Sequence, residues 1–467
     1  MSRGIRSMAE VISLVLFSFF ASVALGAAPP ATFKAVDVPG TRPFSATVLD
    51  LDRARYVEEE FYVTGVANRY RIANPLETAQ IVDGGHPYAS RIIVRRPLRR
   101  QDFNGTVVVE WYNVTGGQDA DIVFAATHDH LLREGYAFVA VSAQRVGVNT
   151  LRTWNAARYG ALSVDVANAG EANNGRVDAD ALSYDIFGQV GAALKNGDGL
   201  GGLKPTRLIA VGESQSAGRL TSYYNSIQPL HQVYDGFLTY DRAGALRTDI
   251  GVKSISIGTE FTGLRGAPPA DSKDHRWWEV AGASHMSTED LEYMDPVHKR
   301  DGALPRDAAG NTQTVTQMIA SAGCQKNPIF SRVPTGNVLD MGLEQLVAWI
   351  RKGTAPVMAP RLTRDAAGLV RNSEGQVQGG VRLPAYDAPI AENGGANSGP
   401  SFCVLAGYHQ DFTPEALCKR YGSHGGYVKR VQETARQAER SRFLLPADAL
   451  KTRTDAAKFS FNCPVGK

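Results

Sequence analysis

The stretch from Leu208 to Gly218, which reads LIAVGESQSAG, decides the fold class. Its apolar start predicts a short buried strand, small residues then predict a turn, and a helical pattern follows. A strand that passes through a tight turn into a helix is the context of a nucleophile elbow, which holds a serine in a strained conformation. Gly212 and Ser216 leave room around Ser214, although a glycine is more usual at position 216. Ser214 is therefore the predicted nucleophile.

Ser216 is a rival nucleophile, because Ser214 and Gly218 flank it at the same spacing. Ser214 is favoured, since the predicted strand ends one or two residues before it. An ordinary strand–helix turn, with the serines acting as helix caps, is the alternative without catalysis.

Other short apolar runs alternate with helical patterns along the chain, which predicts a mainly parallel sheet covered by helices on both faces. The predicted strands are Arg91–Arg95, Thr106–Trp111, Ala137–Ser142, Leu208–Val211, Gly236–Thr239, Ser254–Ile257 and Trp277–Val280. The predicted helices are Asp121–Arg133, Ala181–Leu194, Ala217–Ile227 and Met341–Lys352.

A serine hydroxyl is a weak nucleophile and needs a base within hydrogen-bond reach. The run RWWEVAGASH ends a predicted strand in small residues and then presents His285. This histidine should lie at the same sheet edge as Ser214, so it is the predicted base. His275 precedes its strand and should lie at the opposite end.

An acidic residue between serine and histidine in the chain should orient the imidazole. Glu260 is the first carboxylate after the strand Ser254–Ile257, and it is the predicted acid. Asp271 and Asp274 on the same connection are alternatives. Glu279 lies within a strand and is expected to be structural.

Fixed hydrogen-bond donors must meet the charge that develops on a reacting carbonyl oxygen. One expected donor is the backbone N–H of Gln215, which follows the nucleophile. The loop Glu110–Gly117, EWYNVTGG, should supply the other from the N–H groups of Asn113, Val114 or Thr115. A tight turn that only requires glycine is the alternative.

Several motifs in order resemble one bacterial family: EWYNVTGG at 110–117, YDIF at 184–187, GESQSA at 212–217, WEVAG at 278–282 and GGVRLP at 379–384. The chain is similar, from about residue 35 to 460, to the alpha/beta hydrolase domain-containing proteins, a group of exported esterases. The resemblance implies an α/β-hydrolase fold and a Ser–acid–His triad, and it carries over Ser214 and His285. Where relatives commonly show Glu-x-Asp, this chain has Glu260-Phe261-Thr262, which leaves Glu260 as the acid.

The expected organisation has four parts. Residues 1–26 carry Arg3, Arg6 and an apolar run, which predicts a secretory signal. Residues 30–90 are expected to form a β-rich extension that packs on the main sheet. The hydrolase core should span 91–353, with 145–180 as a lid, and a C-terminal extension should span 354–467.

All four cysteines lie in the last third of the chain, and an even number in an exported protein suggests two disulfides. Three pairings are possible, of which Cys403–Cys418 with Cys324–Cys463 is preferred. Their wide spacing does not match a zinc site. Export would place the protein in the periplasm or outside the cell.

The formal net charge is only +3, and loss of two arginines and one glutamate with the signal lowers it by one. Such a balance gives no reason to expect a nucleic-acid partner. No stretch after the signal is long and apolar enough for stable membrane insertion. The expected partner is a small or medium ester.

The leading functional hypothesis is an exported serine hydrolase that cleaves carboxylic esters through an acyl-enzyme intermediate. An acyltransferase or peptidase that uses the same triad is the second hypothesis. A non-catalytic binding protein on the same fold is the third, since a fold alone does not fix an activity.

The expected chemistry uses no cofactor and no metal ion. Incubation with EDTA should therefore leave the hydrolytic rate unchanged, because every step is assigned to side chains and backbone N–H groups. The measurement is the initial rate of aryl ester hydrolysis before and after chelation and dialysis. A loss that added divalent metal restores would contradict this mechanism.

Overall fold

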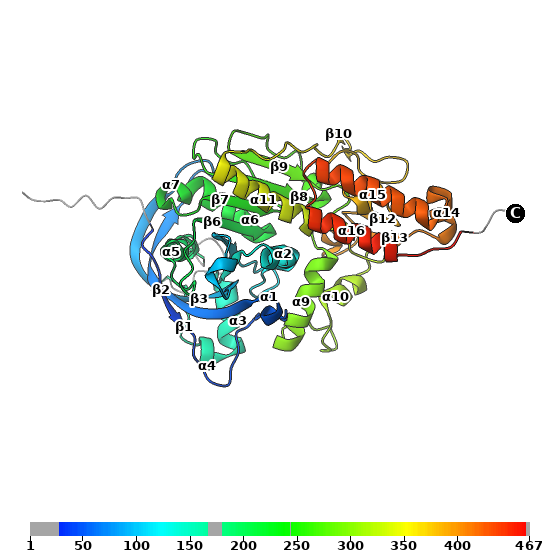
Figure 1. Ribbon diagram of the computed structural model, residues 1–467. Coiled ribbons are helices and arrows are strands. Elements are labelled where there is room, and N and C mark those ends of the chain that lie inside the picture. The colour runs from blue at the N-terminus through cyan, green and yellow to red at the C-terminus, as the bar shows by residue number, and fades with distance from the viewer. Residues whose placement is uncertain (1–27, 167–179, 243, 464–467) are drawn as a thin grey trace, which may run out of the picture.

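The computed structural model describes residues 28–166, 180–242 and 244–463. Its centre is a nine-stranded sheet in the order β1-β2-β3-β5-β4-β6-β7-β8-β9 (Figure 1). The strands of this sheet are β1 (Thr32–Ala35), β2 (Tyr56–Arg71), β3 (Gln80–Pro97), β4 (Thr106–Trp111), β5 (Ala137–Val141), β6 (Arg207–Glu213), β7 (Gly236–Tyr240), β8 (Lys253–Gly258) and β9 (His275–Glu279). Two small hairpins pair β10 (Arg364–Asp365) with β11 (Gly368–Leu369) and β12 (Ala391–Gly394) with β13 (Tyr408–Asp411).

Helices connect and cover these strands. They are α1 (Leu51–Ala54), η1 (Arg100–Asp102), α2 (Ile122–Arg133), α3 (Arg145–Trp154), α4 (Ala156–Tyr159), α5 (Ser183–Asn196), α6 (Ser214–Ser222), η2 (Tyr223–Ile227), α7 (Gln228–His231), α8 (Glu260–Leu264), α9 (Thr288–Asp301), α10 (Val315–Ser321), α11 (Thr335–Lys352), α12 (Pro384–Asp387), α13 (Cys403–Ala406), α14 (Pro414–Tyr421), α15 (His424–Arg440) and α16 (Pro446–Lys458). No helix among the described residues is long and apolar enough to cross a membrane.

The strands from β5 to β9 in the sheet order run parallel to one another, whereas β1, β2 and β3 pair antiparallel. The predicted fold class, a mostly parallel sheet with helices, is confirmed. Residues 30–90, expected as a β-rich extension, form β1, β2 and the first half of β3 at one edge of the sheet. They are continuous with the parallel part because the second half of β3 pairs with β5, while β2 pairs with β3 along its whole length.

Each face of the sheet has its own apolar core, because successive side chains of a strand point to opposite faces. Val108 of β4 belongs to the core that α2, α9 and α11 cover. Val107 and Val109 belong to the core on the other face, which contains residues of α3, α5 and α6. Both faces are buried, which explains why β4 is apolar almost throughout.

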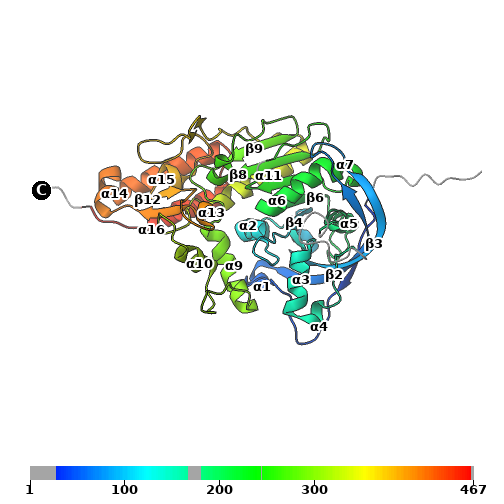
Figure 2. The same ribbon diagram turned by 180° about the vertical axis from the view of Figure 1, so that it is seen from behind.

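The helices α14, α15 and α16 lie at the end of the molecule opposite to β1–β3, whereas α11 covers the middle of the sheet near β7 and β8 (Figures 1 and 2). Ala435 and Phe443 join the core of α2 and α11. The segment around Val381 runs beside β9, since Val381 N–H donates to Glu279 O and Ala281 N–H donates to Val381 O at 3.0 Å. The GGVRLP motif thus lengthens the sheet next to the loop that carries His285.

Two disulfides are present, Cys324–Cys403 and Cys418–Cys463. The expectation of two bridges is confirmed, but the preferred pairing is wrong. Cys403 lies in α13, which packs back toward the 324 region, whereas Cys418 in α14 lies beside the end of the chain.

The signal predicted at 1–26 lies outside the described residues, as does the 167–179 part of the lid predicted at 145–180.

Buried charges tie the antiparallel strands to the parallel part of the sheet. The side chain of Arg91 in β3 is fully buried and donates to Glu60 Oε1 of β2 at 2.9 Å. It also donates to Asp119 Oδ2 at 3.2 Å, within the loop that follows β4. Arg91 therefore links that loop to the edge strands, because its buried guanidinium pairs with a carboxylate on each side.

Replacement of Arg91 by alanine should lower the free energy of unfolding by about 3–5 kcal/mol, because it leaves the buried Asp119 without its cationic partner and removes one of the two arginines that pair with Glu60. The matched control is Arg99→Ala, which removes an exposed ion pair with Asp102 and should cost about 0–1 kcal/mol. Urea unfolding followed by circular dichroism measures both. Equal losses for the two variants would contradict the structural role of the buried network.

Candidate active site

Ser214 lies at the junction of β6 and α6 with a φ angle of 50°, in the left-handed region. A non-glycine residue there carries about 1–3 kcal/mol of strain, which persists only where the surroundings enforce it. A Cβ at Gly212 would lie 3.0 Å from the Ser216 Oγ and from Leu220 Cδ1, so only glycine fits without rearrangement. The turn has the geometry that the sequence predicted for an elbow.

Ser216 occupies a different environment from Ser214. Its side chain is fully buried, and its hydroxyl accepts from Glu213 N–H at 3.0 Å and donates to Glu213 O at 2.9 Å. Ser214 is partly exposed. The hydroxyl of Ser216 thus braces the turn and is closed to a ligand.

His285 lies in the loop after β9, and its imidazole is held between two carboxylates. Its Nδ1 hydrogen-bonds Asp241 Oδ2, and its Nε2 lies 3.2 Å from Glu213 Oε1. Glu213 directly precedes Ser214, so the imidazole lies at the sheet edge where the elbow is. In the described part of the chain, Nε2 pairs with Glu213 and not with the Ser214 hydroxyl.

Asp241 directly follows β7 and also has a left-handed φ angle, of 51°. Its Oδ1 accepts from the N–H and the hydroxyl of Thr259, both at 2.9 Å, and Thr262 donates to the same carboxylate. Burial alone would raise the pKa of Asp241, but the His285 imidazole and these donors lower it below its usual value. The carboxylate is therefore ionised and fixed against the imidazole.

Glu260, the predicted acid, does not reach His285. Its Oε1 accepts from Gly282 N–H at 2.8 Å, and its Oε2 accepts from Arg371 at 2.6 Å. This corrects the prediction, and the physical reason is that Glu260 begins α8, which turns its side chain toward the C-terminal extension. Glu260 braces the 280–285 loop, while Asp241 holds the imidazole.

The other acidic candidates are also engaged elsewhere. Asp271 accepts from Trp277 N–H at 2.9 Å and from Arg361 at 2.7 Å. Asp274 pairs with Lys253. Glu279 pairs with Arg364, as expected for a structural residue.

Sequence reasoning missed Asp241 and Glu213, and both had a usable signal. Asp241 is the first residue after the strand Gly236–Tyr240. An acid that orients an imidazole at this sheet edge requires such a position. Glu213 stands inside the quoted elbow, directly before the predicted nucleophile. A carboxylate at the end of each parallel strand indicates a group at the same sheet edge.

The loop after β4 offers fewer free donors than the sequence suggested. Asn113 N–H donates to Ala120 O at 3.0 Å, and Thr115 N–H donates to its neighbour Asn113 Oδ1 at 2.8 Å. Val114 N–H makes only a long contact of 3.5 Å, to Gln215 Oε1. Gln215 N–H lies in the first turn of α6, where backbone donors have no partner within the helix. Val114 and Gln215 are thus the two candidates that remain available.

Glu213 is the second carboxylate of the site. It is 5% exposed, and its Oε2 accepts from Asn113 Nδ2 at 2.8 Å. Burial raises the pKa of Glu213 to about 8, with His285 opposing the rise. Burial would lower the pKa of His285, but Glu213 and Asp241 outweigh it and raise that pKa to about 9.

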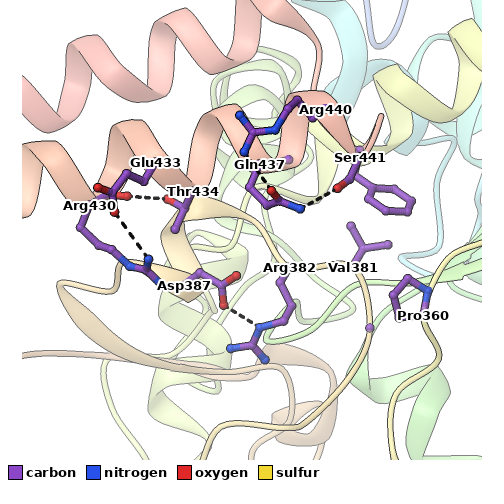
Figure 3. Close-up of a pocket in the computed structure, with 13 residues that line it drawn as sticks. Pro360, Val381, Arg382, Asp387, Arg430, Glu433, Thr434, Gln437, Arg440 and Ser441 are labelled. Carbon is purple, nitrogen blue, oxygen red and sulfur yellow. Dashed lines mark hydrogen bonds and ion pairs between the residues drawn. The ribbon is translucent and has the colours of Figure 1, made fainter.

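Two cavities lie away from Ser214. One, of about 420 Å³, lies between α15 and the 380–387 segment (Figure 3). Its charged side chains are paired with each other, Arg382 with Asp387 at 2.6 Å and Arg430 with Glu433 at 3.8 Å. The other, of about 810 Å³, lies between α2, α9 and α16.

No group of three or more metal-ligating side chains suited to an ion occurs among the described residues.

No curated protein matches the chain in sequence. Solved structures resemble parts of it. An alignment with esterase Est22 covers 42% of this chain and 48% of that one, so it spans less than half of Est22, at 13% identity and a TM-score of 0.24. A fungal esterase from Rhizomucor miehei aligns over 56% and 91%, at 11% identity and a TM-score of 0.29. An alpha-beta serine hydrolase homologue from Coxiella burnetii aligns over 46% and 92%, at 11% identity and a TM-score of 0.27.

The family model described as alpha/beta hydrolase domain matches residues 27–454. This match covers most of the chain, and the mostly parallel sheet with its strand–turn–helix junction at Ser214 agrees with it. The protein is therefore a member of the alpha/beta hydrolase domain family.

Proposed function

We propose that this hydrolase cleaves carboxylic esters with Ser214 as nucleophile, His285 as base and Asp241 as the acid that orients the imidazole. The observation that carries the proposal is the meeting of three loops at one sheet edge. Ser214 has a left-handed φ angle in the elbow, and His285 contacts both Asp241 and the residue before Ser214. A strained serine beside an oriented imidazole is the arrangement used in acyl transfer.

In the proposed reaction, His285 Nε2 takes the proton of the Ser214 hydroxyl as the oxygen attacks the ester carbonyl carbon. Asp241 stabilises the imidazolium that forms. The tetrahedral intermediate collapses, the C–O bond to the alcohol breaks, and His285 returns its proton to the leaving oxygen. Water then attacks the acyl-enzyme by the same route and regenerates Ser214.

The N–H groups of Val114 and Gln215 are proposed to bind the oxyanion. Gln215 directly follows Ser214, and Val114 N–H contacts the Gln215 side chain at 3.5 Å, which brings the two loops together. Asn113 contributes indirectly, because its side chain bonds to Glu213 and its carbonyl and N–H pair with Ala120. The backbone holds both donors in place, and only the long contact from Val114 N–H to Gln215 Oε1 must be given up as charge develops on the ester oxygen.

A small or medium ester is the proposed substrate, because His285 and Asp241 are deeply buried and a bulky chain would not approach them. Rates on p-nitrophenyl esters of increasing acyl length would test this. Strong hydrolysis of a polymeric ester, with no hydrolysis of the p-nitrophenyl esters, would contradict this substrate class.

The two disulfides support an oxidising compartment, either periplasmic or extracellular.

Replacement of Ser214 by alanine should lower kcat for a short aryl ester by about five to six orders of magnitude, because the nucleophile is lost. The matched control, Ser216→Ala, should reduce it at most about tenfold, the loss expected for one hydrogen bond. Labelling by a fluorophosphonate probe should disappear only in the Ser214 variant. The reverse pattern would assign the nucleophile to Ser216, and no labelling of the wild type would favour a binding protein.

Replacement of Asp241 by asparagine should lower kcat by about 10⁴-fold, because the amide no longer fixes the tautomer of His285 or stabilises its cation. Glu260→Gln is the control, since it removes an equally buried carboxylate that does not contact the imidazole. It should keep kcat within about tenfold while lowering thermal stability. Steady-state kinetics and melting curves of both variants decide the matter, and a larger kcat loss for Glu260→Gln would restore Glu260 as the acid.

A further inference from the structure

Glu213 holds the nitrogen of His285 that the proposed function needs. Its Oε1 lies 3.2 Å from Nε2, the atom that must accept the proton of Ser214. Its Oε2 is anchored by Asn113 Nδ2 at 2.8 Å, so the carboxyl group cannot swing away freely. With its Nδ1 hydrogen-bonded to Asp241 and its Nε2 in an ion pair with Glu213, the imidazole has both nitrogens engaged by carboxylates and neither by Ser214.

The contact between Glu213 and Nε2 requires a proton. Nδ1 carries the N–H that donates to Asp241, so an unprotonated Nε2 presents a lone pair. That lone pair would face the lone pairs of an ionised carboxylate, which is repulsive. The contact is favourable in three states: an imidazolium beside a carboxylate, an imidazolium that donates to the carbonyl oxygen of a protonated Glu213, or a neutral imidazole that accepts from a protonated Glu213. In each of these states one proton lies between Nε2 and Oε1.

We infer that Glu213 is a positioning residue that locks His285 through this shared proton, so that Ser214 gains its base only after the proton leaves. The inference rests on the proposed function. Loss of the proton turns the contact repulsive, and Nε2 then accepts from the Ser214 hydroxyl instead. The acidic limb of the rate profile therefore reports the pair Glu213–His285, and not an isolated histidine.

The surroundings of the imidazole favour the locked state. The charged groups that face it are Asp241 at the end of β7, Glu213 at the end of β6 and Asp290 in the first turn of α9, and all three are acidic. Phe261 covers the ring, with the ring centroids 4.7 Å apart. Anions on several sides of a buried imidazole stabilise its proton, and the raised pKa values of His285 and Glu213 agree with this. The base form is then populated only in alkaline solution, above the usual range of a histidine.

The decisive variant is Glu213→Gln. A glutamine keeps the length of the side chain and an oxygen that accepts from Asn113, but it cannot ionise. A purely structural role for Glu213 is therefore preserved, while the negative charge that stabilises the imidazolium is removed. The amide N–H in the place of Oε1 can donate only to a neutral Nε2, so it disfavours the protonated imidazole. Because an opposite charge at this range shifts a pKa by about 1–3 units, the acidic limb should move down by at least about one pH unit.

The experiment measures the rate of fluorophosphonate labelling and of p-nitrophenyl acetate hydrolysis from about pH 5 to 10, in the wild type and in Glu213→Gln. Asp290→Asn is the matched control, because it removes a buried carboxylate that does not touch Nε2. We expect an alkaline limb in the wild type, a shift of about one unit or more toward acid in Glu213→Gln, and a smaller shift in Asp290→Asn. Labelling near pH 7 should become about tenfold faster in Glu213→Gln.

An unchanged limb, or a shift toward alkaline pH, in Glu213→Gln would overturn the inference. If Ser214→Ala is then still inactive, the proposed function stands and only the lock is lost. If the wild type neither hydrolyses the ester nor reacts with the probe, the proposed function itself fails. NMR titration of the His285 ring, assigned with His285→Gln, applies even to a slow variant, and an equal pKa with and without Glu213 would again refute the lock.

Discussion

The contact between the His285 imidazole and the buried Asp241 carboxylate is the constraint on which the site depends. It joins a loop after β9 to the end of β7, while Glu213 joins both to β6. These three loops meet because parallel strands present their carboxyl ends at one edge of the sheet. The two helix-covered cores on the faces of the sheet therefore serve the site directly, since they hold in place the strands whose ends carry these residues.

Features that depend on neighbouring residues could be predicted from the sequence. The apolar run of β4 and the strand–turn–helix of β6 and α6 are encoded within a dozen residues each, and both were placed correctly. The position of His285 at the edge near Ser214 followed from the strand Trp277–Val280 and the small residues after it. In each case the signal was a local pattern, and tertiary contacts only reinforced it.

Features that depend on which distant loops meet could not be predicted in the same way. Glu260 and Asp241 both follow a buried strand, and the sequence does not reveal that α8 turns Glu260 toward Arg371. The pairing of Cys324 with Cys403 likewise depends on where α13 packs. Glu213 was missed because its importance comes from a histidine far along the chain, although its own position in the elbow was plain.

The C-terminal extension has a consequence for the evolution of this enzyme. Arg371 holds Glu260, which holds Gly282, and Met286 N–H donates to Leu405 O at 3.0 Å, so the histidine loop is clamped from residues well beyond the core. The extension cannot be exchanged between relatives as an independent cassette, because its partner surface is the histidine loop itself. A substitution in this late segment should instead require a compensating substitution in the loop, because the two segments pack against each other.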